Sequence, residues 1–474
     1  MATAFIKLIS RRALLRAGAG LVATTAGRQV SADTGRSYRI TAAPGQARLT
    51  GHQRRATDVW AYDGTVPGPT LRVRQGEPVR IIVDNRLGQD TTVHWHGIRL
   101  PVAMDGVPGI SQPPIRPGGT FVYEFTPPDA GTFWYHPHAN SLQQLGRGLA
   151  GPLIVEEREP VAVDRELLWM VMDWRLKPDG QISAGFGNMM EAAMAGRVGN
   201  TVTLNGVVPE DEPVRAGERV RIRLVNGALA RIMALRFDGH RPVVVAIDGQ
   251  PCDPHEPADG RILLGPAMRV DVILDMQGEP GRRYRVLDDF YDGLDYWLTH
   301  LAYDARPPVR PHPPDTPLRL PRNPLPAPDL AAAGRLELVL QGGMMGGMAG
   351  MMGMGRAVWA INGTSMIGDG HADMTPLATL TAGRSYVLIL RNDTAWWHPM
   401  HLHGHSFRLM RRNSTAVPHD VWSDTVLLAP RDAVEVAFVA DNPGDWMLHC
   451  HVTDHQTAGL MTVLRIGGGG NYKQ

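Results

Sequence analysis

Residues 71–85 read LRVRQGEPVRIIVDN, a glycine turn followed by an alternating apolar strand that ends at an asparagine. The same pattern recurs as PVRAGERVRIRLVN at 213–226 and as LTAGRSYVLILRN at 380–392. Apolar residues that alternate with a period of two predict strands with one buried face. Three copies of one such unit predict three related domains in an all-β fold of sandwich or barrel type.

The composition agrees with many short strands joined by turns. The chain of 474 residues contains 53 glycines and 38 prolines, and its length suggests about three domains. We expect domains at 35–157, 160–304 and 331–467, with a proline-rich linker at 305–330. The 48 basic and 47 acidic side chains balance, which argues against nucleic acid or a lipid surface as a partner.

The first 32 residues are predicted to be a targeting segment outside the fold. Arg11 and Arg12 directly precede an apolar run at 17–26, as in a twin-arginine export signal. An ordinary basic amino terminus is the alternative interpretation. The run is too short for a membrane span. We therefore expect a monomer without a membrane span, carried to the periplasm by the twin-arginine export machinery.

Pairs of histidines follow two of the three repeats at the same spacing. The positions nine and eleven residues after the closing asparagines hold His94 and His96, Leu235 and Phe237, and His401 and His403. Further His-x-His pairs end later strands of the first and third domains, at His136 and His138 and at His449 and His451. Each pair presents both rings on one strand face. Eight imidazoles without carboxylates suit several copper ions, so the first and third domains are predicted to face each other. The second domain, with Leu235 and Phe237 at these positions, is predicted to be structural.

The stretch HCHVTDH at 449–455 adds a thiol to these histidines. On a strand, Cys450 points away from the faces of its two neighbours. A thiolate with two imidazoles is the ligand set of an electron-transfer copper. The alternative is a buried free cysteine beside hydrogen-bonded histidines. Cys252, in a predicted turn, is expected to be a structural thiol.

Four motifs together resemble the copper-binding motifs of the multicopper oxidase family, which includes three-domain bacterial laccases and periplasmic cuprous oxidases. They are HWHG at 94–97, HPH at 136–138, HPMHLHG at 398–404 and HCHVTDH at 449–455. The resemblance implies three cupredoxin-like Greek-key β-sandwich domains and four copper ions, one of type 1, one of type 2 and two of type 3. It implies type 1 ligands His398, Cys450 and His455, type 2 ligands His94 and His401, and type 3 ligands His96, His136, His138, His403, His449 and His451.

By the same resemblance, Leu460 occupies the axial position of the type 1 site, ten residues after Cys450. Met461 is adjacent, but strand alternation is expected to turn it to the other face. A side chain that does not coordinate leaves the copper with three ligands, which favours Cu(I) and raises the reduction potential.

Three polar residues are candidates for supporting roles. Asp105 matches a family acid near the trinuclear cluster, where protons are needed, although Asp105 before Gly106 is also a typical turn. Gln456 stands where some bacterial members have a glutamate, and an amide cannot relay protons as a carboxylate does. Asp424 resembles a family aspartate close to the type 1 site, where it would orient a ligand or cap a strand.

A glycine-rich tract at 342–355 contains six thioethers. These are Met344, Met345, Met348, Met351, Met352 and Met354. Because thioethers are soft donors, the tract is a candidate for recruiting Cu(I). The alternative is a loop whose methionines cover apolar surface. Met189, Met190 and Met194 are expected to be ordinary helix-packing residues.

Three functions follow from these observations. The first is oxidation of Cu(I) at the type 1 copper, coupled to four-electron reduction of dioxygen to water, in copper tolerance. The second is a general laccase that oxidises phenols and aryl amines. The third is a non-enzymatic cupredoxin-fold protein of cell division, which is disfavoured because every ligand position is filled.

Overall fold

Each asparagine that closes a repeat holds the following turn in the same way. The side-chain amide of Asn85 donates to the carbonyl oxygens of Gln89 and Ile115 at 2.8 and 2.7 Å, and its Oδ1 accepts from the backbone N–H two residues on. Asn226 and Asn392 make the same three kinds of bond. All three are buried, where an amide must be satisfied. The repeats are therefore equivalent in structure as well as in sequence.

The computed structural model describes residues 36–51, 55–315, 318–344, 358–369 and 374–467. The predicted export segment lies outside these residues, as do all methionines of the 342–355 tract except Met344. Among the described residues, no helix is long and apolar enough to cross a membrane.

The first domain begins the series of strands. Its elements are β1 Arg36–Ala47, β2 Thr57–Tyr62, β3 Leu71–Arg74, β4 Val79–Asn85, β5 His94–His96, β6 Thr120–Phe125, β7 Gly131–His136 and β8 Gly151–Glu156, with the 3-10 helix η1 Val102–Met104 and α1 Ser141–Gly146. Two sheets form, with strand orders β2-β1-β4-β6 and β3-β8-β7-β5. The pairs β1–β4 and β3–β8 are parallel.

The second domain also has two sheets, and each contains more strands than those of the first domain. Its elements are β9 Arg165–Trp174, β10 Thr201–Leu204, β11 Glu212–Val214, β12 Arg219–Asn226, β13 Met233–Phe237, β14 Val243–Ile247, β15 Gln250–His255, β16 Ile262–Leu264, β17 Arg269–Asp275, β18 Arg283–Asp288 and β19 Tyr296–Tyr303, with α2 Met189–Ala192 and the 3-10 helix η2 Ala258–Gly260. The strand orders are β10-β9-β12-β17-β14-β15 and β11-β19-β18-β13-β16. Leu235 and Phe237 pack in the core of this domain.

The third domain completes the series. Its elements are β20 Gly334–Gly342, β21 Trp359–Ile361, β22 Ala378–Leu380, β23 Ser385–Asn392, β24 His398–Leu402, β25 Phe407–Arg412, β26 Thr415–Ala416, β27 Trp422–Ser423, β28 Thr425–Leu428, β29 Ala433–Val439, β30 Gly444–Cys450 and β31 Met461–Ile466, with α3 Thr453–Thr457. One sheet has the order β21-β20-β23-β29-β25-β26 with β27 beside β25, and the other is β22-β31-β30-β24-β28. The predicted all-β fold of three β-sandwich domains is confirmed.

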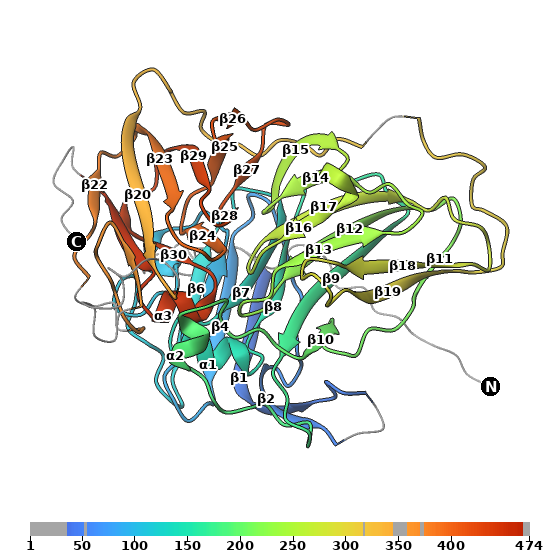
Figure 1. Ribbon diagram of the computed structural model, residues 1–474, viewed down its shortest axis with the longest axis horizontal. Coiled ribbons are helices and arrows are strands. Elements are labelled where there is room, and N and C mark those ends of the chain that lie inside the picture. Colours follow the sequence, from blue (N-terminus) through green and yellow to red (C-terminus); the bar gives the residue numbers. More distant parts are fainter. Residues whose placement is uncertain (1–35, 52–54, 316–317, 345–357, 370–373, 468–474) are drawn as a thin grey trace, which may run out of the picture. The chain divides into compact units, whose positions relative to one another are not determined.

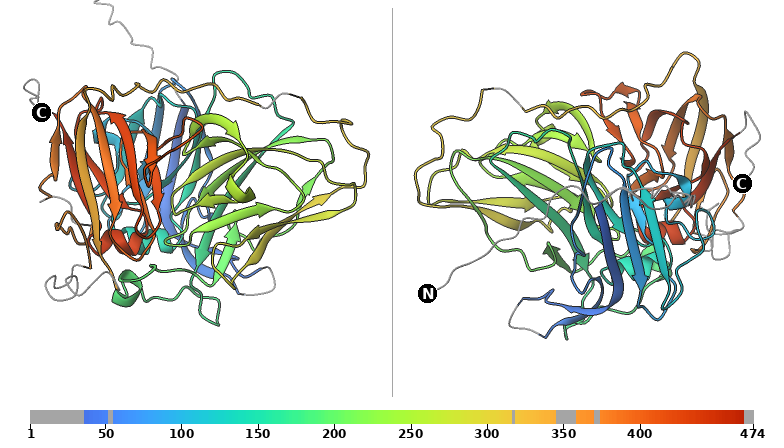
Figure 2. Two further views of the ribbon diagram at one scale, coloured as in Figure 1. Left: turned by 45° about the horizontal axis from the view of Figure 1, so that its top comes forward. Right: turned by 180° about the vertical axis from the view of Figure 1, so that it is seen from behind.

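The second and third domains both pack against the first domain. Strands β20–β31 lie at the left of Figure 1 and β9–β19 at the right, and the view from behind in Figure 2 brings the first-domain strands to the front. Strand β7 contacts β12 and β17 of the second domain. The described part of segment 305–330 forms no helix or strand, and the side chain of Asn323 donates from this segment to the carbonyl oxygens of Ala130 and Gly249 at 2.8 and 3.3 Å. The segment thus ties the first two domains together.

Candidate metal centre

One group of ligand atoms lies within the third domain. The Sγ atom of Cys450 is 3.5 Å from Nδ1 of His398 and 3.6 Å from Nδ1 of His455. The outer nitrogen of His455 donates to the carbonyl oxygen of Met194 at 2.8 Å, and the outer nitrogen of His398 is 2.9 Å from the Thr394 hydroxyl. Both Nδ1 atoms therefore face the sulfur. This buried set of one thiol and two imidazoles fits an electron-transfer copper.

Eight further histidines converge where the first and third domains meet. Antiparallel pairing sets β5 against β7 in the first domain and β24 against β30 in the third. Each domain therefore brings its own two His-x-His pairs side by side. Their ring nitrogens form overlapping groups in which the atoms lie within 4.8 Å of one another. All eight side chains are buried: His94, His96, His136, His138, His401, His403, His449 and His451. The histidines come from the two domains that the spacing of the motifs predicts.

Hydrogen bonds fix the tautomers of these rings. The Nδ1–H groups of His94, His136, His401 and His449 donate to the carbonyl oxygens of Asp105, Pro137, Asp424 and Cys450 at 2.8, 3.2, 2.9 and 3.0 Å. A carbonyl oxygen can only accept, so the lone pair of each ring lies on Nε2.

The resulting lone pairs face one another inside the cluster. Nε2 of His403 is 3.1 Å from Nε2 of His449, and no described residue bonds to Nε2 of His94 or His401. Burial is the main cause that lowers the pKa of the rings, so they remain neutral as ligands; this holds for His96, His136, His138, His401, His403 and His451. Neutral nitrogens that converge without protons between them fit metal ions.

Asp105 joins two of these rings. Its carboxylate oxygens lie 2.8 Å from Nδ1 of His403 and 3.2 Å from Nδ1 of His94. The backbone N–H of Asp105 also closes the short helix η1, and Gly106 follows at φ 82°. A Cβ at Gly106 would lie 1.9 Å from the carbonyl oxygen of Val93, so only glycine fits. Both interpretations of Asp105 thus describe one feature, because the turn carries the carboxylate to the cluster.

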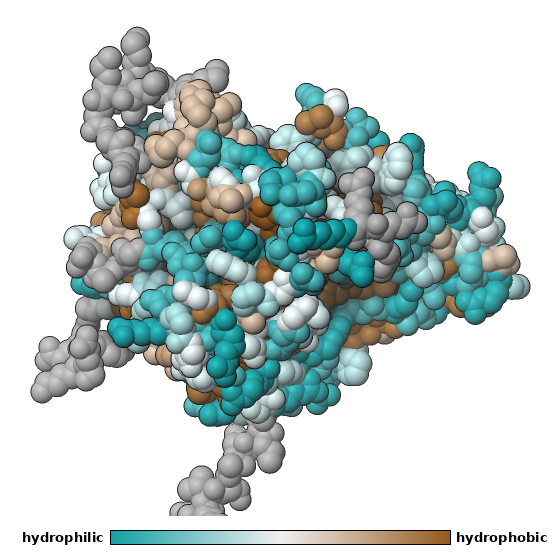
Figure 3. Space-filling view, turned by 90° about the horizontal axis from the view of Figure 1, so that it is seen from below, coloured by the Kyte–Doolittle hydropathy of each residue, from teal (hydrophilic) through white to brown (hydrophobic). Residues whose placement is uncertain are grey.

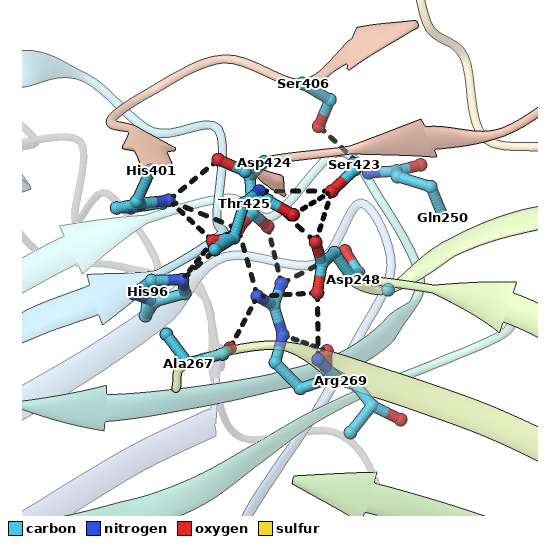
Figure 4. Close-up of polar contacts among 12 residues, drawn as sticks. His96, Asp248, Gln250, Ala267, Arg269, His401, Ser406, Ser423, Asp424 and Thr425 are labelled. Atoms are coloured by element: carbon cyan, nitrogen blue, oxygen red, sulfur yellow. Dashed lines mark hydrogen bonds and ion pairs between the residues drawn. The ribbon is translucent and has the colours of Figure 1, made fainter. Parts of the chain in front are cut away.

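Asp424 lies at the eight-histidine cluster, and our prediction that it lies close to the type 1 ligands is wrong. Its Oδ1 is 3.2 Å from Nε2 of His96 and 3.2 Å from Nδ1 of His401 (Figure 4). The reason is the register of β24 and β28, which pairs His401 with Thr425. His398 pairs with Leu428 at the other end of the same strand.

A buried arginine holds Asp424 in place. Burial alone would raise the pKa of Asp424, but Arg269 and His401 hold it well below its usual range. Burial and the charge of Asp424 raise the pKa of Asp248, which lies on the other side of the guanidinium. Nothing in the local sequence around Arg269 signals this role, because Thr132 and Asp424 come from the other two domains.

The methionines near α2 are exposed, and our prediction that they pack in a helix core is wrong. Met189, Met190 and Met194 are 53%, 55% and 38% exposed. The helix has only four residues, of which only Ala192 is buried. Helices α1 and α2 lie in the lower half of Figure 1, and Figure 3 views the molecule from below. On that face, hydrophobic residues are scattered among hydrophilic ones.

Met344 connects the methionine tract to this region. Its backbone N–H donates to the carbonyl oxygen of Ala193 at 2.7 Å, and its own carbonyl accepts from Trp396 at 2.9 Å. The other five candidate methionines of the tract lie outside the described residues. Met344 therefore bonds to the residue before Met194, and the carbonyl of Met194 accepts from His455.

Cys252 and His405 belong to none of the groups of ligand atoms among the described residues. Cys252 lies in strand β15, so the predicted turn is wrong, but the thiol is buried in the core of the second domain, and burial raises its pKa to about 12. His405 packs edge-on against Phe438 and Trp446, and burial lowers its pKa to about 4. Nδ1–H of His405 also donates to the carbonyl oxygen of His403 at 3.2 Å.

Comparison with known proteins agrees with this geometry. Three sequence models, each described as multicopper oxidase, match residues 43–160, 166–294 and 350–469. The chain is 31% identical to multicopper oxidase MmcO of Mycobacterium tuberculosis over 85% of its length and 82% of that protein. It is 30% identical to copper resistance protein A of Escherichia coli over 59% of its length and 53% of that protein. The crystal structure of a multicopper oxidase from Pseudomonas thermotolerans superimposes with a TM-score of 0.81 at 37% identity, covering 91% of this chain and 99% of that one.

Proposed function

This chain belongs to the multicopper oxidase family of oxidoreductases with cupredoxin-like domains, which use copper and oxygen, and on that premise we propose that it holds four copper ions. The observation that carries the proposal is the convergence of buried ring nitrogens from two domains, among which Nε2 of His94 and Nε2 of His401 bond to no described residue. We assign the type 1 copper to His398, Cys450 and His455, the type 2 copper to His94 and His401, and the type 3 pair to His96, His136, His138, His403, His449 and His451.

Copper held by Cys450 would accept single electrons, and copper held by the cluster histidines would supply the four electrons that, with four protons, reduce dioxygen to two waters. The chain itself provides the path, because Cys450 is covalently joined to His449 and His451 of the cluster. Burial of all these residues excludes bulk water. Asp105 fixes the rings of His94 and His403, and we propose that it also holds a proton for the reaction.

We propose Cu(I) as the reductant, in copper tolerance. His455 is fully buried, and the atom that covers its outer nitrogen is the carbonyl oxygen of Met194. Met189, Met190 and Met194 are exposed residues in or close to α2, and the N–H of Met344 donates to the carbonyl oxygen of Ala193, the residue before Met194. Soft sulfur donors suit Cu(I). The similarity to a protein named copper resistance protein A points the same way.

The second candidate is a general laccase for phenols and aryl amines. An organic ring has no direct access to His455 while Met194 covers it. Phenol oxidation therefore requires a longer electron path, and we rank it below Cu(I). A non-enzymatic role in cell division ranks last, because the ligand set of an oxidase is complete.

We also propose export to the periplasm through the twin-arginine pathway and a monomeric protein. The paired arginines at 11 and 12 support the export route. The domain limits 35–157, 160–304 and 331–467, with a linker at 305–330, remain our proposal for the mature chain.

Metal analysis tests the proposal. The copper-loaded protein should contain about four copper ions per chain and show an intense blue absorption from the Cys450 thiolate. Cys450→Ser should abolish the blue band and oxidase activity and keep about three coppers. The matched control is Cys252→Ser, which removes the other buried thiol and should leave the blue band, the oxidase activity and the copper content unchanged. One copper per chain, or mainly zinc in active protein, would contradict the assignment.

A further inference from the structure

Arg269, the first residue of β17, is fully buried, and its five N–H donors all have acceptors. Figure 4 shows its guanidinium beside Asp248 and Asp424. Nη1 and Nη2 donate to the two carboxylate oxygens of Asp424 at 3.0 and 2.5 Å. The remaining donors reach the carbonyl oxygens of Ala267, Thr132 and Asp248 at 3.1, 3.2 and 3.0 Å. One second-domain side chain therefore bonds to all three domains, and its orientation is fixed.

Asp424 transmits this orientation to two cluster histidines. One carboxylate oxygen, Oδ1, is shared by Nη1 of Arg269, Nε2 of His96 and the hydroxyl of Thr425, the last at 2.7 Å. The backbone carbonyl of Asp424 accepts from Nδ1–H of His401 at 2.9 Å. The carboxylate can only accept from His96, so it holds the proton on Nε2 and leaves the lone pair on Nδ1. Nδ1 of His96 faces Nε2 of His136 at 3.5 Å.

The surrounding backbone is shaped to admit this ion pair. Gly97 follows His96 at φ 86°, and a Cβ there would lie 2.3 Å from Nη2 of Arg269 and 2.5 Å from Oδ2 of Asp424. From the second domain, a carboxylate oxygen of Asp248 accepts from Thr425 N–H at 3.2 Å. A buried ion pair is weak evidence for stability, because an apolar replacement of similar volume is often as stable. The shape and the contacts with ligand rings favour a role in positioning.

We propose that Arg269 is a positioning residue of the oxidase: by clamping Asp424, it fixes the tautomer and ring orientation of His96 and the place of His401. The second domain, which supplies no copper ligand, thereby takes part in building the cluster. This inference rests on the copper assignment above. It concerns a bidentate clamp, which lysine cannot reproduce with one ammonium group.

Arg269→Lys, which keeps the charge and removes the fork, tests the clamp. Copper affinity of the cluster should fall about 10- to 100-fold, the usual cost of removing a partner of a metal ligand. The type 2 copper signal in electron paramagnetic resonance should change its hyperfine splitting. The blue band should persist, because none of the contacts of Arg269 reaches His398, Cys450 or His455. The matched control is Arg221→Lys, a buried second-domain arginine paired with Asp271.

The outcomes separate this inference from the copper assignment. Wild-type protein without a blue band and a type 2 signal would overturn the assignment itself. A normal wild type with an unchanged cluster in Arg269→Lys would overturn the clamp, and so would equal changes in Arg269→Lys and Arg221→Lys. If the lysine variant does not fold, Asp424→Asn serves instead, since it keeps the shape and removes the clamped charge. The cluster affinity must then fall while the blue band remains.

Discussion

Leu460 is tied to the Cys450 site by its backbone. Its carbonyl accepts from the N–H of Cys450 at 2.9 Å, and its N–H donates to the carbonyl of His455 at 2.9 Å. Its side chain packs in the same apolar cluster as Cys450. Met461 packs in a separate cluster with Val107. This arrangement supports Leu460 as the axial residue.

Leu460→Met is predicted to lower the reduction potential of the type 1 copper. A thioether would add a donor that stabilises Cu(II) relative to the three-coordinate site. A redox titration of the blue band measures the change, and turnover of phenols that are hard to oxidise should fall before turnover of easy ones. Met461→Leu is the control and should leave the potential unchanged. An unchanged or higher potential in Leu460→Met would show that position 460 is not axial.

At this scale, spacing along the chain identifies the ligand candidates, and it fails for their partners. The His-x-His pairs and Cys450 follow from strand alternation and from counting after each repeat. Thr394, Met194 and Arg269 contact ligands or their partners across turns and domains, so no local pattern marks them. The predicted place of Asp424 is wrong because the sequence around it does not show the register of β28 against β24. That register decides which end of β24 Asp424 lies beside.

Helix α2 is the element whose role sequence reasoning missed. Asn188 caps it by accepting from Met190 N–H at 2.9 Å, and the N–H of Arg197 donates to a carboxylate oxygen of Asp454 in α3 at 2.8 Å. These bonds hold the chain across His455 and leave the methionines outside. A helix of four residues is too short for an apolar stripe, so the periodicity that predicts packing has no meaning there.

Replacing Met189, Met190 and Met194 together with leucine is predicted to raise KM for Cu(I) severalfold. Leucine keeps the apolar volume and the backbone bond to His455 but removes the soft sulfur donors. The KM for a phenol, the copper content and the blue band should not change. The control exchanges the buried Met170 and Met172 of β9 for leucine. Equal Cu(I) kinetics in the variant and wild type would leave the Cu(I) role to the tract that begins at Met344, or move the laccase assignment ahead.

At the scale of the whole molecule, the sequence predicts which domains face each other but not how the second domain takes part. Histidines in the first and third domains require an interface between them, and the structure has it. The second domain was expected to be structural because Leu235 and Phe237 replace its histidines. It reaches the sites instead through Met194 and Arg269, whose contacts arise only when the domains dock.

Copper removal is predicted to weaken the joint between the first and third domains. The cluster takes four histidines from each of these domains, so metal bound there favours the docked state over the unfolded chain. One site at a hundredfold excess over its dissociation constant contributes about 2.7 kcal/mol. Calorimetry should therefore show a lower melting temperature, by at least several degrees, after removal of all copper.

The Cys450→Ser variant separates the two kinds of site in the same measurement. The ligands His398, Cys450 and His455 all belong to the third domain, so losing this copper removes no link between domains. The variant should keep most of the copper-dependent rise in melting temperature. A variant that loses the whole rise, or a wild type that melts at one temperature with and without copper, would mean that the cluster does not join the domains.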